Sequence, residues 1–187
     1  MSRFGRKQGT AHSGPVGDAP RAGTVHGTVG VDRVPGPTRA LSGLPALHYA
    51  DRFTLTTDTV ATPERWARTL FGDVPGPAAW FLWRGLLGLR LSRGRSPDTV
   101  AGWRVAARGE DWIRLETASW FLACALVVST SGGRLSLATF LHYDRRLPGR
   151  AIWTPLSAVH RRLAPGLLRG AEARVRLPGT GPGTRTS

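Results

Sequence analysis

Sulfur is nearly missing from the chain: among its 187 residues, Cys124 is the single cysteine and Met1 the single methionine. One cysteine excludes an intramolecular disulfide, a zinc finger and a paired-thiol redox motif. This composition fits a reducing compartment best. The basic first residues are followed by small and polar residues rather than the apolar stretch of a secretory signal, so we expect a cytoplasmic protein.

Long apolar runs are missing as well. The longest, residues 120–128 and 78–91, are short or are interrupted by Arg84 and Arg90, whereas a membrane-spanning helix needs about 20 apolar residues. The apolar share is nevertheless 41 %, with seven Trp and six Phe, which is enough for a folded core. We therefore predict a folded domain without a transmembrane segment.

Motifs of common enzymes are also absent. The sequence contains no glycine-rich phosphate loop, no HExxH and no GxSxG. The five histidines are scattered, and His12 and His26 lie in the N-terminal region. We therefore predict neither a metal site nor a cofactor.

Acidic residues are few, and the formal net charge is +14 with a pI near 11.8. Lys7 is the only lysine, so nearly all the basic residues are arginine, and the chain is also rich in Gly and Pro. Because GC-rich codons encode all three residue types, codon composition explains the charge and argues against a nucleic-acid partner. The densest basic groups are Arg90, Arg93 and Arg95, and then Arg145, Arg146 and Arg150.

Three regions differ in composition. Residues 1–44 hold nine of the 24 glycines and no Trp or Tyr, which predicts a disordered tail. Because Met1 is the only methionine, an alternative stays open in which the true start is a Val codon between Val25 and Val34. Residues 45–173 hold all seven Trp and form the predicted domain, and residues 174–187 form a second disordered tail.

The predicted domain opens with a strand and two helices. Apolar and polar residues alternate over 49–57, as in a half-buried strand. Thr62 and Pro63 are typical of a helix start and Gly72 of a helix end. Residues 78–91 are apolar nearly all round and predict a second, mostly buried helix.

Two antiparallel hairpins are expected next, and the first spans residues 103–117. Pairing Ala107 with Ile113 places Arg104 opposite Glu116, which predicts a cross-strand ion pair.

The second hairpin turns at residues 132–133 and pairs Val128 with Leu137 and Leu126 with Thr139. The face that carries these residues is the bulkier one, so we expect it to meet the helices.

The closing element is predicted to be the longest amphipathic helix, over residues 147–173, with His160 on its apolar stripe. Thr154 and Pro155 are expected to start its main part, and Pro165 is expected to kink it.

Several local motifs accompany this order of elements: LWRGLLGLR at 82–90, GWRV at 102–105, LATF at 137–140 and SAVHRRLAP at 157–165. Together they resemble a family of short, uncharacterised actinobacterial domains of unknown function, similar to compact START-like or polyketide cyclase (SRPBCC, helix-grip) proteins. The resemblance covers roughly residues 49–173. It implies an α+β fold in which an antiparallel sheet wraps around or packs against a long C-terminal helix, with two short helices after the first strand. It implies no established activity, and fewer strands are recognisable than in a typical helix-grip sheet, so we expect a smaller cavity.

Candidate polar site residues lie on faces expected to point inward. His160 could hydrogen-bond a ligand or transfer a proton, or it could be a structural histidine bonded to the backbone. Thr139 and Tyr143 place hydroxyl groups on the inward sheet face, where they would orient a ligand, although both types also favour strands. His160 and Tyr143 are the candidate proton-transfer residues.

Candidate apolar and charged lining residues complete the set. Trp103, Trp120 and Trp153 line a cavity or fill the core. We predict that Trp120 and Tyr143 line one cavity with Trp153 and His160. Arg84 interrupts an apolar helix, so it must reach water, an acidic partner or an anionic ligand.

The function predicted from the sequence is binding of a small hydrophobic molecule between the sheet and the C-terminal helix. An alternative is a cyclase, dehydratase or isomerase that uses the same pocket. A second alternative is a module that binds nucleic acid or an anionic surface through its arginines. The sequence predicts no oligomeric state.

Overall fold

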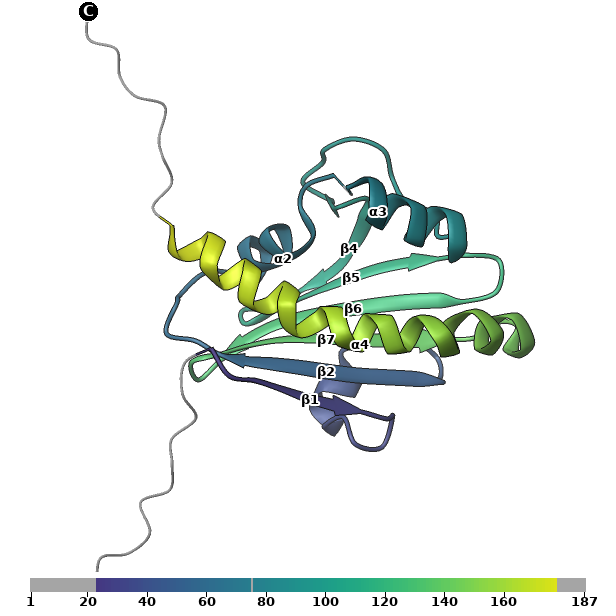
Figure 1. Ribbon diagram of the computed structural model, residues 1–187, viewed down its shortest axis with the longest axis horizontal. Coiled ribbons are helices and arrows are strands. Elements are labelled where there is room, and N and C mark those ends of the chain that lie inside the picture. Colours follow the sequence, from purple (N-terminus) through teal and green to yellow (C-terminus); the bar gives the residue numbers. More distant parts are fainter. Residues whose placement is uncertain (1–22, 75, 178–187) are drawn as a thin grey trace, which may run out of the picture.

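Seven antiparallel strands form one sheet in the computed structural model, which describes residues 23–74 and 76–177 (Figure 1). The spatial order of the strands is β1-β2-β7-β6-β5-β4-β3. Their bounds are β1 (Val25–Val29), β2 (Tyr49–Thr56), β3 (Thr99–Val100), β4 (Trp103–Arg108), β5 (Trp112–Ala118), β6 (Ala123–Ser131) and β7 (Arg134–His142).

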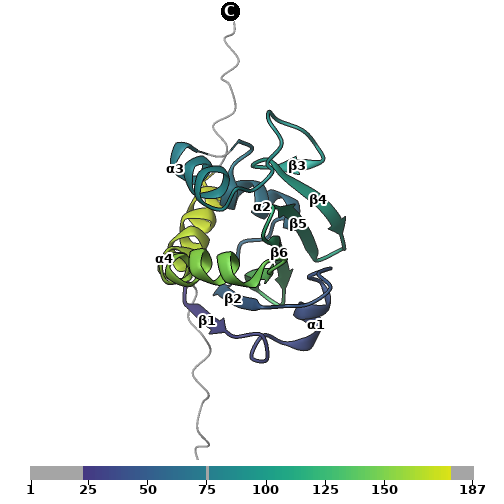
Figure 2. The same ribbon diagram turned by 90° about the vertical axis from the view of Figure 1, so that its right-hand side faces the viewer.

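The helices are α1 (Gly36–Ala40), α2 (Pro63–Phe71), α3 (Pro77–Trp80) with the π-helical segment η1 (Phe81–Leu86), and α4 (Arg146–Arg176). The long helix α4 crosses one face of the sheet (Figure 1). Figure 2 shows the sheet curving so that α2 and α4 lie on its concave side while α1 lies on the other side. The predicted α+β class, with a sheet packed against a long C-terminal helix, is confirmed.

Each face of the sheet has its own hydrophobic cluster. The main core joins the concave face to α2 and α4 and includes Trp66, Leu126, Leu137 and Leu168. On the convex face lies a second cluster, the back-face cluster, formed by Val34, Ala50, Ala125, Val127, Ala138 and Phe140. Strands β6 and β7 are covered on both faces. Each therefore contains a run of consecutive buried residues instead of the alternating pattern of a half-buried strand.

The N-terminal prediction is wrong for residues 23–44. Strand β1 pairs with β2 along its whole length, and the segment after it packs Val34, Val31 and Leu41 into the back-face cluster. These apolar residues are scattered and form no periodic pattern in the sequence. They nevertheless cover the convex face of the sheet, where they pack against residues of β6 and β7 that come much later in the chain. Residues 1–22 of the predicted tail lie outside the described part of the chain.

The hairpins follow the predicted pattern with one irregularity. Arg104 lies opposite Glu116, and their side chains form an ion pair at 2.6 Å. Ala107 pairs with Arg114 and not with Ile113, because the register shifts after Val105. The second hairpin has the predicted register throughout β6 and β7, and its bulkier face meets the helices.

Helix α2 has the predicted bounds. The Arg65 N–H donates to the Thr62 hydroxyl at 3.2 Å, and Gly72 ends the helix with a positive φ of 79°.

The second predicted helix is shorter and less buried than expected. It ends at Leu86, and Gly88 then takes a positive φ of 60°. Phe81 is 72 % exposed and Leu86 45 % exposed. The buried leucines that suggested a longer helix, Leu87, Leu89 and Leu91, belong to the non-helical chain after it.

Helix α4 is longer than predicted at both ends. It begins at Arg146 and runs through Pro155 and Pro165, so Thr154 and Pro155 do not start its main part. Its first turns pack against Tyr143, the residue after β7: Gly149 lies so close to the Tyr143 ring that an added Cβ would stand 2.7 Å away. At the other end the helix continues to Arg176, so residues 174–176 do not belong to a tail, and Arg176 forms ion pairs with Asp58 and Glu172.

No helix among residues 23–74 and 76–177 is both long enough and apolar enough to cross a membrane.

Candidate functional site

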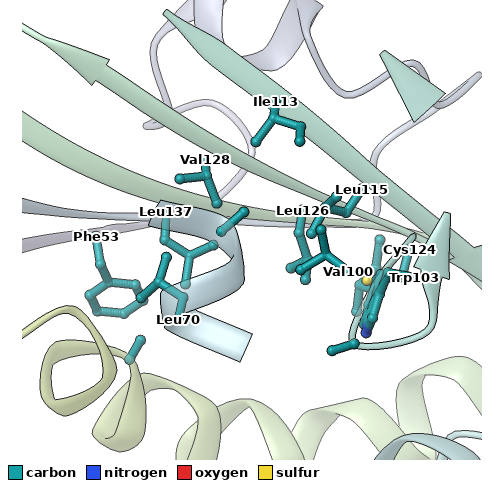
Figure 3. Packing of buried hydrophobic residues seen from close by; sticks show 14 of the residues in the cluster. Phe53, Leu70, Val100, Trp103, Ile113, Leu115, Cys124, Leu126, Val128 and Leu137 are labelled. Atoms are coloured by element: carbon teal, nitrogen blue, oxygen red, sulfur yellow. The ribbon is translucent and has the colours of Figure 1, made fainter. Parts of the chain in front are cut away.

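A cavity of about 390 Å³ lies between the concave face of the sheet, α4 and the segment formed by α3 and η1. Figure 3 shows Trp103, Cys124 and Leu126 on the strands that face the helices. Every lining residue is apolar except Cys124, Thr139 and His160. The aromatic part of the wall comes from Phe71, Trp83, Trp103 and Trp153.

The cavity reaches the surface along α4. Three of its lining residues on this helix, Val159, Leu163 and Leu167, are 49 %, 56 % and 37 % exposed. Ala79 and Leu82, from α3 and η1, also line the cavity and are partly exposed. An apolar molecule would therefore meet apolar side chains at the entrance before it reached the interior.

His160 is the one ionisable imidazole on the cavity wall. Its Nε2 lies 3.0 Å from the Asp51 carboxylate and 3.2 Å from the Thr139 hydroxyl. The ring also lies beside Trp153, at 5.6 Å between centroids, and beside Phe53, at 6.2 Å. Helix α4 thus supplies the imidazole, and strands β2 and β7 supply the groups that hold it.

Asp51 is completely buried, with 0 % of its side chain exposed. The Tyr49 hydroxyl donates to Asp51 Oδ2 at 2.5 Å, and His160 Nε2 approaches the same oxygen. Burial and the neighbouring Asp51 carboxylate raise the pKa of Tyr49, so its hydroxyl stays protonated and remains a donor. The second carboxylate oxygen, Oδ1, has no hydrogen-bond partner among the described residues.

Cys124 lies on the cavity wall with an exposed fraction of 5 %. Burial raises the pKa of its thiol, and Asp51 adds to this effect, so the thiol is neutral and adds little polarity to the wall.

The structure brings four of the predicted site residues together. Trp103, Thr139, Trp153 and His160 all line the cavity. They come from β4, β7 and α4, whose relative placement depends on the curvature of the whole sheet.

The other three predicted residues lie elsewhere. Trp120 is 58 % exposed in the turn between β5 and β6, beneath the guanidinium of Arg145, and lines no part of the cavity. Arg84 is exposed, and its guanidinium lies 5.0 Å from the ring centre of Trp80. Tyr143 is buried against Gly149 on the far side of Trp153, outside the cavity. The prediction that Trp120 and Tyr143 share a cavity with His160 is therefore wrong, because β6 begins at Ala123, after Trp120, and β7 ends at His142, before Tyr143.

Tyr143 lines a separate surface cleft of about 540 Å³. Three arginines of α4, Arg146, Arg150 and Arg161, also line this cleft, and none of them forms an ion pair with a described residue. The His48 ring stacks on Tyr143 at 5.2 Å, and burial, His142 and Arg146 lower the pKa of His48.

Asp51 is the residue of this site that the sequence interpretation missed. The signal was present, because Asp51 has the same strand parity as Tyr49, Phe53 and Leu55 and therefore belongs to the face predicted to be buried. An acidic residue at such a position needs a partner, and the sequence does not show which residue that is.

No group of three or more His, Cys, Asp or Glu side chains that could hold a metal ion is found among the described residues.

Comparison with known proteins adds little to this description. No protein-family model matches the chain, and no curated protein matches it. Among solved structures, a conserved protein of unknown function from Enterococcus faecalis is similar over 71 % of this chain and 75 % of that one, with 14 % identity and a TM-score of 0.30. A similarity of this size carries no argument about fold family or function.

Proposed function

We propose that the protein binds a small apolar molecule in the cavity between the sheet and α4. The observation that supports this proposal is the cavity of about 390 Å³ with an almost wholly apolar lining. Protein interiors are close-packed and rarely keep voids much larger than a water molecule, whereas ligand pockets have volumes of about 300–1,000 Å³. A helix-grip fold, which the sequence resembles, would place a ligand in the same position between sheet and helix, and we include that family assignment in the proposal.

The entrance adds a second line of support. Val159, Leu163 and Leu167 leave a row of apolar surface on α4 that a soluble domain gains nothing from exposing. A ligand that covers these side chains as it enters would remove part of that surface from water.

Methoxynaphthalene, an apolar aromatic ether, is a suitable probe for the cavity, and equilibrium dialysis measures its binding. We expect saturable binding with one molecule per chain. Val159→Trp should fill the entrance and weaken binding about tenfold or more, which corresponds to about 1.4 kcal/mol.

Leu147→Trp is the matched control, because it places the same side chain on the same helix at a position that is 85 % exposed and lines no part of the cavity. It should leave binding unchanged. Absence of saturable binding, or equal binding by the two Trp variants, would contradict the proposal. Native mass spectrometry of protein from its own host would then identify the natural molecule.

A second candidate function is proton-transfer catalysis, such as cyclisation, dehydration or isomerisation, on a molecule bound in the same cavity. The observation that favours it is the contact of 3.0 Å between His160 and the buried carboxylate of Asp51. His160 keeps the proton-transfer role that the sequence predicted for it, whereas Tyr143 lies outside the cavity and does not enter this candidate.

A further inference from the structure

Asp51 determines which nitrogen of His160 carries the proton. An ionised carboxylate only accepts hydrogen bonds. Tyr49 donates to Oδ2 of Asp51 at 2.5 Å, and Nε2 of His160 lies 3.0 Å from the same oxygen. The arrangement therefore assigns the hydrogen to Nε2, with the Thr139 hydroxyl oxygen 3.2 Å away as a weaker second acceptor. In the neutral imidazole the other nitrogen, Nδ1, then carries a lone pair.

Nδ1 makes no hydrogen bond to a described residue. The hydrogen bonds of His160 to other described side chains all use Nε2, and its ring lines the cavity with 21 % of the side chain exposed. In an otherwise apolar wall, Nδ1 is thus an acceptor that residues 23–74 and 76–177 do not satisfy.

The neighbouring indole N–H of Trp153 is buried, although its ring centre lies 5.6 Å from that of His160, so the ligand's hydrogen bond is assigned to Nδ1 alone. A neutral hydroxyl group suits Nδ1, because it can donate one hydrogen bond without bringing a charge into the apolar wall. A cationic amine matches it less well, because no carboxylate lines the cavity and the chain carries a net charge of +14.

We propose that Nδ1 of His160 accepts a hydrogen bond from a hydroxyl group of the apolar ligand and that Asp51 is the positioning residue that holds the imidazole hydrogen on Nε2 and orients the ring. This inference rests on the proposed function, because it assumes that a molecule occupies the cavity. It adds that the ligand carries a hydroxyl group at the end that lies against α4 and β2.

Naphthol and methoxynaphthalene test the inference as a pair, because they differ only in that the ether cannot donate. The ether is the more apolar compound, so a purely hydrophobic cavity would prefer it. For the wild-type protein we expect the opposite, a preference for naphthol of about tenfold, the size expected for one hydrogen bond.

His160→Phe keeps an aromatic ring and removes the acceptor. It should abolish the preference for naphthol while methoxynaphthalene still binds. Asp51→Asn offers both a donor and an acceptor to His160, so the tautomer is no longer fixed, and the preference should fall. Ser157→Ala is the matched control, because this buried hydroxyl on α4 bonds only the Thr154 carbonyl and lies outside the cavity lining. It should leave both affinities unchanged.

Two further measurements guard against a folding defect. If Asp51→Asn does not fold, Thr139→Val removes the other partner of Nε2 and should reduce the preference by a smaller factor. Nitrogen NMR of protein with labelled histidine should show a lone-pair signal for Nδ1 of His160 that moves when naphthol, but not methoxynaphthalene, is added.

The outcomes separate the two proposals. If neither compound binds the wild-type protein, both the proposed function and this inference are wrong. If both bind and the wild-type protein shows no preference for naphthol, or if His160→Phe keeps that preference, the cavity proposal stands and the inference about Asp51 and His160 is overturned.

Discussion

Replacing Val34 by alanine is expected to destabilise the protein, although this residue lies in a stretch whose composition is typical of a disordered tail. Val34 is 1 % exposed in the back-face cluster, against Ala50 and Phe140 of the sheet. Removing two buried methyl groups costs about 0.8 kcal/mol each, and a residual cavity adds to this. We therefore expect a loss of about 2 kcal/mol in the free energy of unfolding.

Urea unfolding followed by tryptophan fluorescence measures this loss, and Trp112, which packs against the back-face cluster, is a local reporter. In thermal unfolding the same change should lower Tm by about 4–8 °C for a protein of this size. Val60→Ala is the matched control, because Val60 is 94 % exposed and should change stability by less than about 0.5 kcal/mol.

Equal unfolding midpoints for Val34→Ala and Val60→Ala would contradict this prediction. That result would mean that residues 23–44 do not dock on the sheet and that the composition-based prediction of a disordered tail was right.

Three further perturbations follow from the described contacts. Arg68→Ala should cost about 1 kcal/mol by urea unfolding at neutral pH, because Arg68 forms an ion pair with Asp73 at 2.9 Å. The hydrogen bond from Arg68 lowers the pKa of Asp73, so the stabilisation by this ion pair is complete above the ordinary Asp pKa of about 3.9 and is lost as pH falls through the lowered pKa. If wild type and Arg68→Ala still differed as much in stability in strong acid, this explanation would be wrong. Gly166→Ala should raise Tm, because alanine favours the helix and its Cβ would meet no atom within 4 Å in α4. Gly102→Ala should lower Tm, because φ is +80° there and the Cβ would lie 2.7 Å from a backbone oxygen. Burial raises the pKa of the Cys124 thiol, so its alkylation should be slow in the folded protein and fast in urea. Bound methoxynaphthalene should slow the reaction further, and mass spectrometry measures the amount of alkylated protein.

Local signals predicted the regular elements well. The cap at Thr62, the glycine that ends α2 and the register of the second hairpin depend on residues within a few positions of one another. The α+β class follows from the order of those elements, since a bulky sheet face and a long amphipathic helix bury each other.

Predictions that depended on the position of an element's end were less successful. Leu89 and Leu91 are buried as expected but lie outside the helix. Trp120 lies in the turn between β5 and β6, where its side chain is exposed to solvent. Helix α4 continues through Pro155, because its docked first turns stabilise it there more than the proline weakens it.

The candidate site was predicted in part. The inward positions of Thr139 and His160 followed from strand parity and helix periodicity, which are local properties. Asp51 had the right parity but no partner in the sequence, because the imidazole that contacts it comes from the other end of the chain.

Local sequence patterns therefore predicted strands β2 and β4 to β7, helices α2 and α4, and the faces that they bury, since the periods of strands and helices are properties of adjacent residues. Three features follow only from the fold: residues 23–44 cover the convex face of the sheet, a cavity remains beneath α4, and Asp51 contacts His160. All three depend on how a curved sheet of seven strands brings distant segments together. Local periodicity contains no information about that curvature or about the space it leaves unfilled.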